Sequence, residues 1–102
     1  MRATWTNLHV GCHDMKVLYA PSFVRKYKNL PHSLQLEIRE KIALFQHKEN
    51  HQTLHVHKLR GKLKDQYSFR VNYKFRVVFI YTPEMPKTAI LMAIGDHDVY
   101  NR

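Results

Sequence analysis

The stretch YSFRVNYKFRVVFIY, residues 67–81, decides the fold. On either side of Asn72, apolar and aromatic residues alternate with polar ones, which is the period of a strand with one buried face. Asn72 itself is a residue that favours tight turns. The stretch predicts two antiparallel strands, with Arg70, Lys74 and Arg76 on the face opposite the aromatic rings. The predicted buried face carries Tyr67, Phe69, Val71, Tyr73, Phe75, Val77, Phe79 and Tyr81.

Before this stretch, the sequence predicts a short strand and a helical hairpin. Residues 16–19 are rich in strand-forming types, and Ser22 is a suitable N-cap for the helix that follows. Pro31 interrupts the helical period, and a second helix begins near His32 or Ser33. The expected apolar stripes are Phe23, Tyr27 and Leu30 on the first helix and Leu34, Ile38, Ile42 and Phe45 on the second.

After it, prolines predict a loop over 82–87, and the nearly all-apolar run 88–94 predicts an interior strand that ends at Gly95. The expected fold is α+β: an N-terminal strand, a helical hairpin and an antiparallel β-meander, with the helices packed on one face of the sheet. One domain over residues 15–102 is expected. Residues 1–14 show no clear period and are expected to form a poorly ordered extension.

Charge is the most informative bulk property. The 17 Lys and Arg residues outnumber the 8 Asp and Glu residues, which gives a net charge of +9. Such an excess favours polyanionic partners, and by itself it leaves RNA, DNA, an acidic protein and a membrane surface open. No apolar run approaches the roughly 18 residues of a membrane span. Cys12 is the single cysteine, so no intrachain disulfide can form, and a cytoplasmic location is expected.

Basic residues are concentrated between positions 58 and 76. Arginine presents a fork of donors that matches phosphate oxygens, so Arg70 and Arg76 could hold a phosphodiester. The alternative is a solvated polar face of an antiparallel sheet. The cations of this region are Lys58, Arg60, Lys62, Lys64, Arg70, Lys74 and Arg76, opposed only by Asp65.

Histidines suggest a catalytic role and a metal-binding alternative. His97 and Tyr100 follow the last strand, and a histidine can donate or accept a proton in phosphoryl transfer. A histidine hydrogen-bonded into the domain is the structural alternative. His47 and His51 have the spacing of helical metal ligands, but no acidic residue or cysteine completes a set. No metal or other cofactor is predicted.

Residues 15–100 resemble the RelE/ParE superfamily of toxins. Three segments carry the resemblance: HKLRG at 57–61, the paired strands at 67–79, and IGDHDVY at 94–100. The resemblance implies a microbial-RNase-like fold and the toxin of a type II toxin–antitoxin system. Nuclease members cut mRNA, usually at the ribosome, by 2′-hydroxyl transesterification that leaves a 2′,3′-cyclic phosphate and a 5′-hydroxyl.

Residue roles follow from the same resemblance. Arg76 matches the arginine that contacts the scissile phosphate, and Arg70 matches a basic residue beside it. His97 is placed as the acid, with His57 or Tyr100 as the base. The residues expected to bind the flanking RNA are Lys58, Arg60, Lys62, Lys64 and Lys74.

Partners are also implied by the resemblance and the charge. The expected partners are mRNA, the ribosome and a cognate antitoxin whose acidic or amphipathic segment covers the basic surface or the helical hairpin. DNA contact is expected only through the antitoxin. The alternatives are a ParE-like gyrase poison that cuts no RNA, and a degenerate domain that only binds nucleic acid.

Overall fold

The computed structural model describes residues 15–60, 65–83 and 87–96. The extension predicted over residues 1–14 lies outside this part of the chain. The elements in chain order are β1 (Lys16–Tyr19), α1 (Pro21–Lys28), α2 (His32–Phe45), a 3-10 turn (Lys48–Asn50), β2 (His57–Lys58), β3 (Tyr67–Arg70), β4 (Arg76–Thr82) and β5 (Thr88–Gly95). The predicted α+β architecture, with its helical hairpin and antiparallel meander, is confirmed.

One five-stranded sheet, in the order β1-β5-β4-β3-β2, forms the frame of the molecule. The strands β2 to β5 are antiparallel neighbours, whereas β1 pairs with β5 in parallel, from Lys16 opposite Thr88 to Tyr19 opposite Leu91. The strand β5 thus lies inside the sheet, as its apolar sequence predicts. The parallel pairing is possible because the chain between β1 and β5 holds the helical hairpin and the strands β2 to β4, which is far longer than the connection that parallel strands require.

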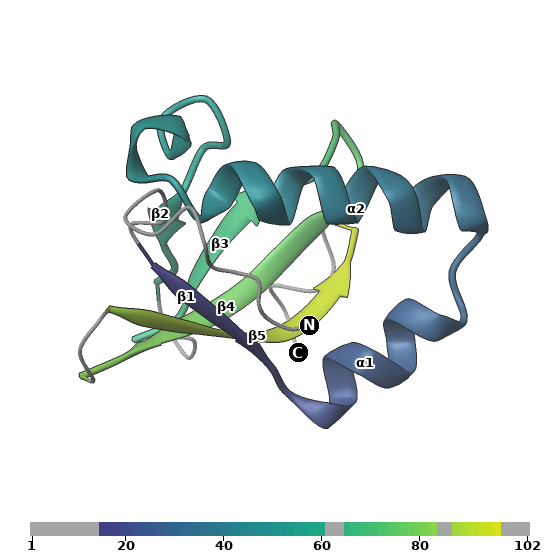
Figure 1. The fold of residues 1–102 in the computed structure, drawn as a ribbon, viewed down its shortest axis with the longest axis horizontal. Coiled ribbons are helices and arrows are strands. Elements are labelled where there is room, and N and C mark those ends of the chain that lie inside the picture. Colours follow the sequence, from purple (N-terminus) through teal and green to yellow (C-terminus); the bar gives the residue numbers. More distant parts are fainter. Residues whose placement is uncertain (1–14, 61–64, 84–86, 97–102) are drawn as a thin grey trace, which may run out of the picture.

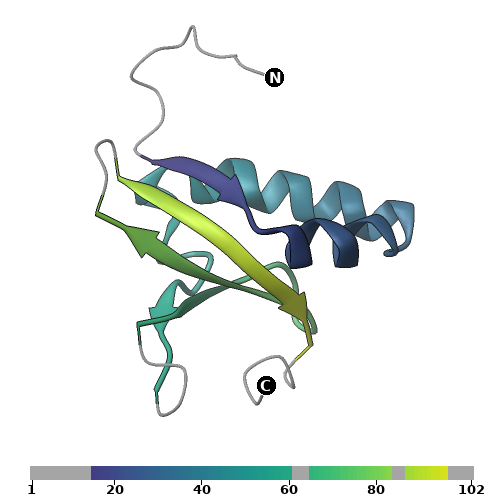
Figure 2. The ribbon, with the colours of Figure 1, turned by 90° about the horizontal axis from the view of Figure 1, so that it is seen from below.

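Both helices lie on one side of the sheet (Figures 1 and 2). Their inner faces and the facing side of β3, β4 and β5 form the main hydrophobic core. Phe45 is central to it, with its ring 4.5 Å from that of Phe69 and 4.7 Å from that of Phe79. Ile38, Ile42 and Phe45 are buried, which confirms the predicted stripe of the second helix. This packing fixes which side of each strand remains available for chemistry.

The start of the first helix differs from the prediction. Its N-cap is Ala20, and the helix begins at Pro21, so Ser22 lies inside the first turn and is not the cap. Proline suits that position because its missing N–H would have no intrahelical partner there. The Ser22 hydroxyl instead donates to the carbonyl of Met92 on β5, at 2.9 Å, and ties the helix to the sheet.

The start of the fourth strand also differs. The strand β4 begins at Arg76, and Tyr73 and Lys74 lie in the preceding turn, so the strand predicted from residue 73 is three residues too long. The Tyr73 side chain is 84% exposed and does not share the core face. The Asn72 Oδ1 atom accepts from the backbone N–H groups of Lys74 and Phe75, both at 2.8 Å. This side-chain turn ends the alternation early, because an Asn carbonyl competes with ladder pairing.

Candidate active site and partner pocket

Two arginines lie side by side at the edge of the meander. Arg70 on β3 is paired with Arg76 on β4, and Arg76 is paired with Gly95 on β5. Their strand neighbours Phe69 and Val77 point into the core, so the alternation directs both arginines to the face away from the helices. Both side chains are half-buried. The geometry thus places two guanidinium groups next to the end of β5.

The guanidinium of Arg76 is held by backbone carbonyls. Its Nη1 atom donates to the carbonyl of Asn72 at 2.7 Å and to that of Phe75 at 3.1 Å. Among the described residues, no hydrogen bond occupies its Nε–Nη2 edge, which could therefore hold an external acceptor. In Arg70, the Nε atom is buried and has no hydrogen-bond partner among the residues that the structure describes. A buried donor of this kind is stabilised when an anion accepts from it.

His57 lies on the same face as the arginine pair. It is opposite Ser68 on β3, and Ser68 is two residues from Arg70, which places His57 in the neighbouring row of side chains. His55 has a φ of 56°, in the left-handed region, and its carbonyl oxygen lies 2.8 Å from the Nδ1 atom of His57. Because a carbonyl only accepts, Nδ1 carries the proton, and in the neutral ring Nε2 is then the basic atom.

The other residues predicted for RNA binding are more dispersed. Lys58 is opposite Tyr67, whose ring packs against the core, so the register places Lys58 on the face away from the arginines. Arg60 is exposed. Lys74 lies in the turn, with its ammonium 5.6 Å from the centre of the Phe75 ring. Lys62, Lys64, His97 and Tyr100 lie outside the described residues.

The histidines considered for a metal have structural contacts. The His51 ring stacks on Phe45 with 4.9 Å between centres, and its Nε2 atom lies 2.7 Å from the Phe45 carbonyl oxygen. Within the described ranges, no group of three His, Cys, Asp or Glu residues could hold a metal ion. His51 therefore serves the packing at the end of α2.

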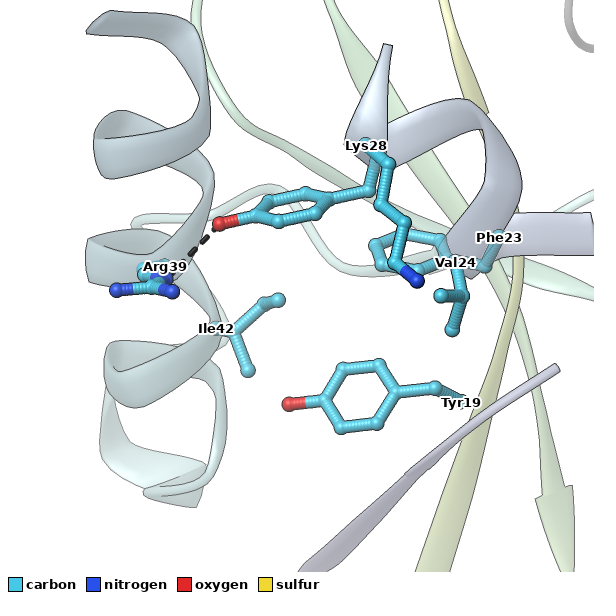
Figure 3. Close-up of a pocket in the computed structure, with 7 residues that line it drawn as sticks. Tyr19, Phe23, Val24, Lys28, Arg39 and Ile42 are labelled. Carbon is cyan, nitrogen blue, oxygen red and sulfur yellow. Dashed lines mark hydrogen bonds between the residues drawn. The ribbon is translucent and has the colours of Figure 1, made fainter. Parts of the chain in front are cut away.

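A second feature, missed in the sequence, is a pocket of about 280 Å³ between the helical hairpin and β1 (Figure 3). The Arg39 Nε atom donates to the Tyr27 hydroxyl at 2.9 Å, which places a guanidinium beside a largely apolar pocket whose lining also includes Lys28. Burial raises the pKa of the Tyr19 phenol, the nearby Tyr27 adds to the rise, and Arg39 opposes it. The lining consists of Tyr19, Phe23, Val24, Tyr27, Lys28, Arg39 and Ile42.

The pocket is suited to an apolar side chain followed or preceded by a carboxylate. Apolar lining surface favours a hydrophobic group, and Arg39 and Lys28 favour negative charge beside it. In the sequence, Tyr19 ends the predicted first strand and Tyr27 belongs to the apolar stripe of the first helix, so neither indicates a pocket. The helical hairpin brings the two tyrosines together.

None of the helices in the described ranges has the length and apolar character that crossing a membrane requires.

A comparison with curated protein sequences gives no significant match. Solved structures share the fold. The RelE of an archaeal RelE–RelB complex from Pyrococcus horikoshii has 17% identity and a TM-score of 0.63, over 81% of this chain and 94% of that chain. A YoeB/ParE toxin from Agrobacterium tumefaciens has 15% identity and a TM-score of 0.59, over 81% and 99%. YafQ from Escherichia coli has 11% identity and a TM-score of 0.59, over 83% and 96%.

A family model gives the decisive match. The model describes the RelE-like toxin HigB of a type II toxin–antitoxin system, and it covers residues 21–91, well over half of the 102-residue chain. The match spans the helical hairpin, the strands β2 to β4 and both arginines, and it ends within β5. The protein belongs to the HigB-like family of RelE-like toxins of type II toxin–antitoxin systems.

Proposed function

We propose that this toxin is a metal-independent endoribonuclease that cuts mRNA at the ribosome. The observation that carries the proposal is the pairing of Arg70 with Arg76, next to the end of β5. Two guanidinium groups on adjacent strands match the oxygens of one phosphodiester and would offset the charge that develops on phosphorus in the transition state. A half-buried location strengthens such an interaction compared with one in bulk water.

The remaining chemistry is a proton transfer at each end of the reaction. RNA supplies its own nucleophile, the 2′-hydroxyl, which attacks the adjacent phosphorus while the 5′-oxygen leaves. A base removes the hydroxyl proton, and an acid protonates the leaving oxygen, giving a 2′,3′-cyclic phosphate and a 5′-hydroxyl. We assign the acid to His97, two residues after Gly95 in the sequence, and the base to His57, which lies on the arginine face. Tyr100 is the alternative base.

The antitoxin is proposed to dock, at least in part, in the pocket between the hairpin and β1. Several of the similar solved structures are toxin–antitoxin complexes, including RelBE2 from Mycobacterium tuberculosis and YoeB–YefM from Staphylococcus aureus. The pocket offers an apolar floor with Arg39 and Lys28 at its edge, and the chain carries a net charge of +9. An acidic, amphipathic segment complements both properties.

The nuclease proposal is tested by the ends of the products. Purified toxin that has been treated with a metal chelator, with the chelator removed before the assay, should cut a labelled mRNA on translating ribosomes into fragments with 2′,3′-cyclic phosphate and 5′-hydroxyl ends. The same preparation should leave DNA gyrase supercoiling unchanged. Inhibited supercoiling with intact mRNA would establish the ParE-like function instead. Salt-sensitive RNA binding without cleavage would indicate a domain that only binds nucleic acid.

A further inference from the structure

Asn72 connects three parts of the molecule. Its Oδ1 atom accepts from the N–H groups of Lys74 and Phe75, and its Nδ2 atom donates to the Glu37 carboxylate on α2 at 2.9 Å. Its backbone carbonyl accepts from the Arg76 guanidinium at 2.7 Å. The side chain of Asn72 thus shapes the turn and fixes it to the helix layer. The backbone carbonyl of the same residue holds Arg76, an arginine of the candidate active site.

The chemistry of the partners determines the orientation of the Asn72 amide. Backbone N–H groups only donate, and an ionised carboxylate only accepts, so Oδ1 must face the turn and Nδ2 must face Glu37. Glu37 and Asn72 are both half-buried, which limits competition from water. The bond joins residues 35 positions apart, so it fixes the turn relative to α2 and not only within itself.

The anchored turn determines how the guanidinium group of Arg76 is oriented. With Nη1 taken up by the carbonyls of Asn72 and Phe75, rotation of the guanidinium is restricted and its Nε–Nη2 edge faces away from the turn. That edge is one of the two on which a guanidinium receives two phosphate oxygens at once. A loose turn would leave the same cation present with its donors aimed elsewhere.

We propose that Asn72, anchored by Glu37, is a positioning residue that orients Arg76 so that its Nε–Nη2 edge receives the scissile phosphate. The claim rests on the proposed nuclease function. Asn72 does not touch RNA; it acts through Arg76. Its loss should therefore reduce kcat much more than it changes KM, because other cations still hold the RNA chain.

A substitution series separates the two bonds of the Asn72 side chain. In Asn72→Asp, the carboxylate still accepts from the turn but faces the Glu37 carboxylate, so the anchor is lost. Adding Glu37→Gln restores it with reversed polarity, because a Gln amide donates to an Asp carboxylate. Cleavage should fall by up to about 100-fold in Asn72→Asp, since a misplacement of roughly 1 Å has effects of that size. It should return most of the way in the double variant.

A matched control and a readout without RNA complete the test. The Asn50 side-chain amide donates to the Leu44 carbonyl at 2.9 Å, at the exposed end of α2. Asn50→Asp removes this donor, as Asn72→Asp does at the turn, and should leave cleavage unchanged. The side-chain NMR signals of Arg76 report whether its guanidinium rotates freely. Separate Nη signals are expected in the wild type, averaged signals in Asn72→Asp, and separate signals again in the double variant.

These two readouts distinguish failure of the positioning role from failure of the nuclease function. If the wild type cuts no RNA but the Arg76 signals follow the series, the nuclease function fails and the positioning of Arg76 stands. If the signals are the same in Asn72→Asp as in the wild type, or if the double variant recovers neither signal nor activity, the positioning role is wrong. Should Asn72→Asp fail to fold, Glu37→Ala removes the anchor with the turn intact and is judged by the same two measurements.

Discussion

Arg70 and Arg76 are directly opposed on neighbouring antiparallel strands, so two like charges share one row of the sheet. Like charges in this arrangement destabilise a sheet, and the buried Nε atom of Arg70 has no partner among the described residues. A pair that costs stability is expected where it is needed for binding an anion. We therefore expect a phosphate to be held between the two guanidinium groups.

The first prediction concerns this cost. Arg70→Gln removes one of the opposed charges and keeps a polar side chain, so the free energy of unfolding at low salt should rise by roughly 0.2–1 kcal/mol. Urea unfolding measures it. Lys74→Gln, in the exposed turn, removes the same charge without an opposed cation and should change stability little. A clear loss of stability in Arg70→Gln would show that the pair is structural.

The second prediction concerns the proposed base. His57 lies one row from the arginines, with its proton held on Nδ1 by the His55 carbonyl. His57→Ala should reduce single-turnover cleavage by about 10²- to 10⁴-fold, the usual contribution of a positioned acid or base. His32→Ala, at an exposed histidine at the start of α2, should have a much smaller effect. Equal losses in the two variants would assign the base elsewhere, with Tyr100 next in line.

The third prediction concerns antitoxin docking. Arg39→Glu reverses the charge at the edge of the apolar pocket, so the Kd for the cognate antitoxin should rise by about tenfold or more, with slower association. Arg25→Glu makes the same change on the other helix of the hairpin, outside the pocket lining. Biolayer interferometry measures both, and melting temperatures check folding. Equal effects of the two variants would mean that only net charge matters.

The fourth prediction concerns alkaline pH. Burial raises the pKa of Tyr19 above its usual 10.0, so the folded state keeps this proton while the unfolded state loses it. The stability that the neutral phenol contributes is therefore complete below pH 10.0 and is lost as the pH rises through the folded value. Tyr19→Phe should lose less stability than the wild type over this range. Tyr73→Phe, at a side chain that is 84% exposed, should follow the wild type.

Much of the fold was predictable because the hydrophobic period is strong. The stripe of Ile38, Ile42 and Phe45 and the alternation through Phe69 and Val77 correctly assign the helices, the strands and their buried faces. The same alternation gives the side of the sheet on which the arginines lie. Their pairing across β3 and β4 depends on register, and the turn at Asn72 sets that register through a side-chain bond that periodicity does not reveal.

Contacts between the helices and the sheet could not be predicted from the sequence. The bond from Asn72 to Glu37 and the pocket beside Arg39 join segments whose spacing in the chain carries no periodic signal. The predicted start of β4 at Tyr73 is wrong because the alternation of apolar and polar residues continues through the turn, where the backbone lies outside the sheet. At Tyr73, local hydrogen bonds of the Asn72 side chain override a pattern that burial alone would predict.

Primer-extension mapping of mRNA after induction of the wild type, Arg76→Ala and His97→Ala tests directly whether the toxin cuts mRNA with these two residues. Discrete cuts within coding regions are expected for the wild type. Cleavage by Arg76→Ala should fall by roughly 10²- to 10³-fold, the effect of removing one donor to the developing charge. A comparable loss is expected for His97→Ala. Intact mRNA in cells that stop growing, or cuts that persist in Arg76→Ala, would contradict these expectations.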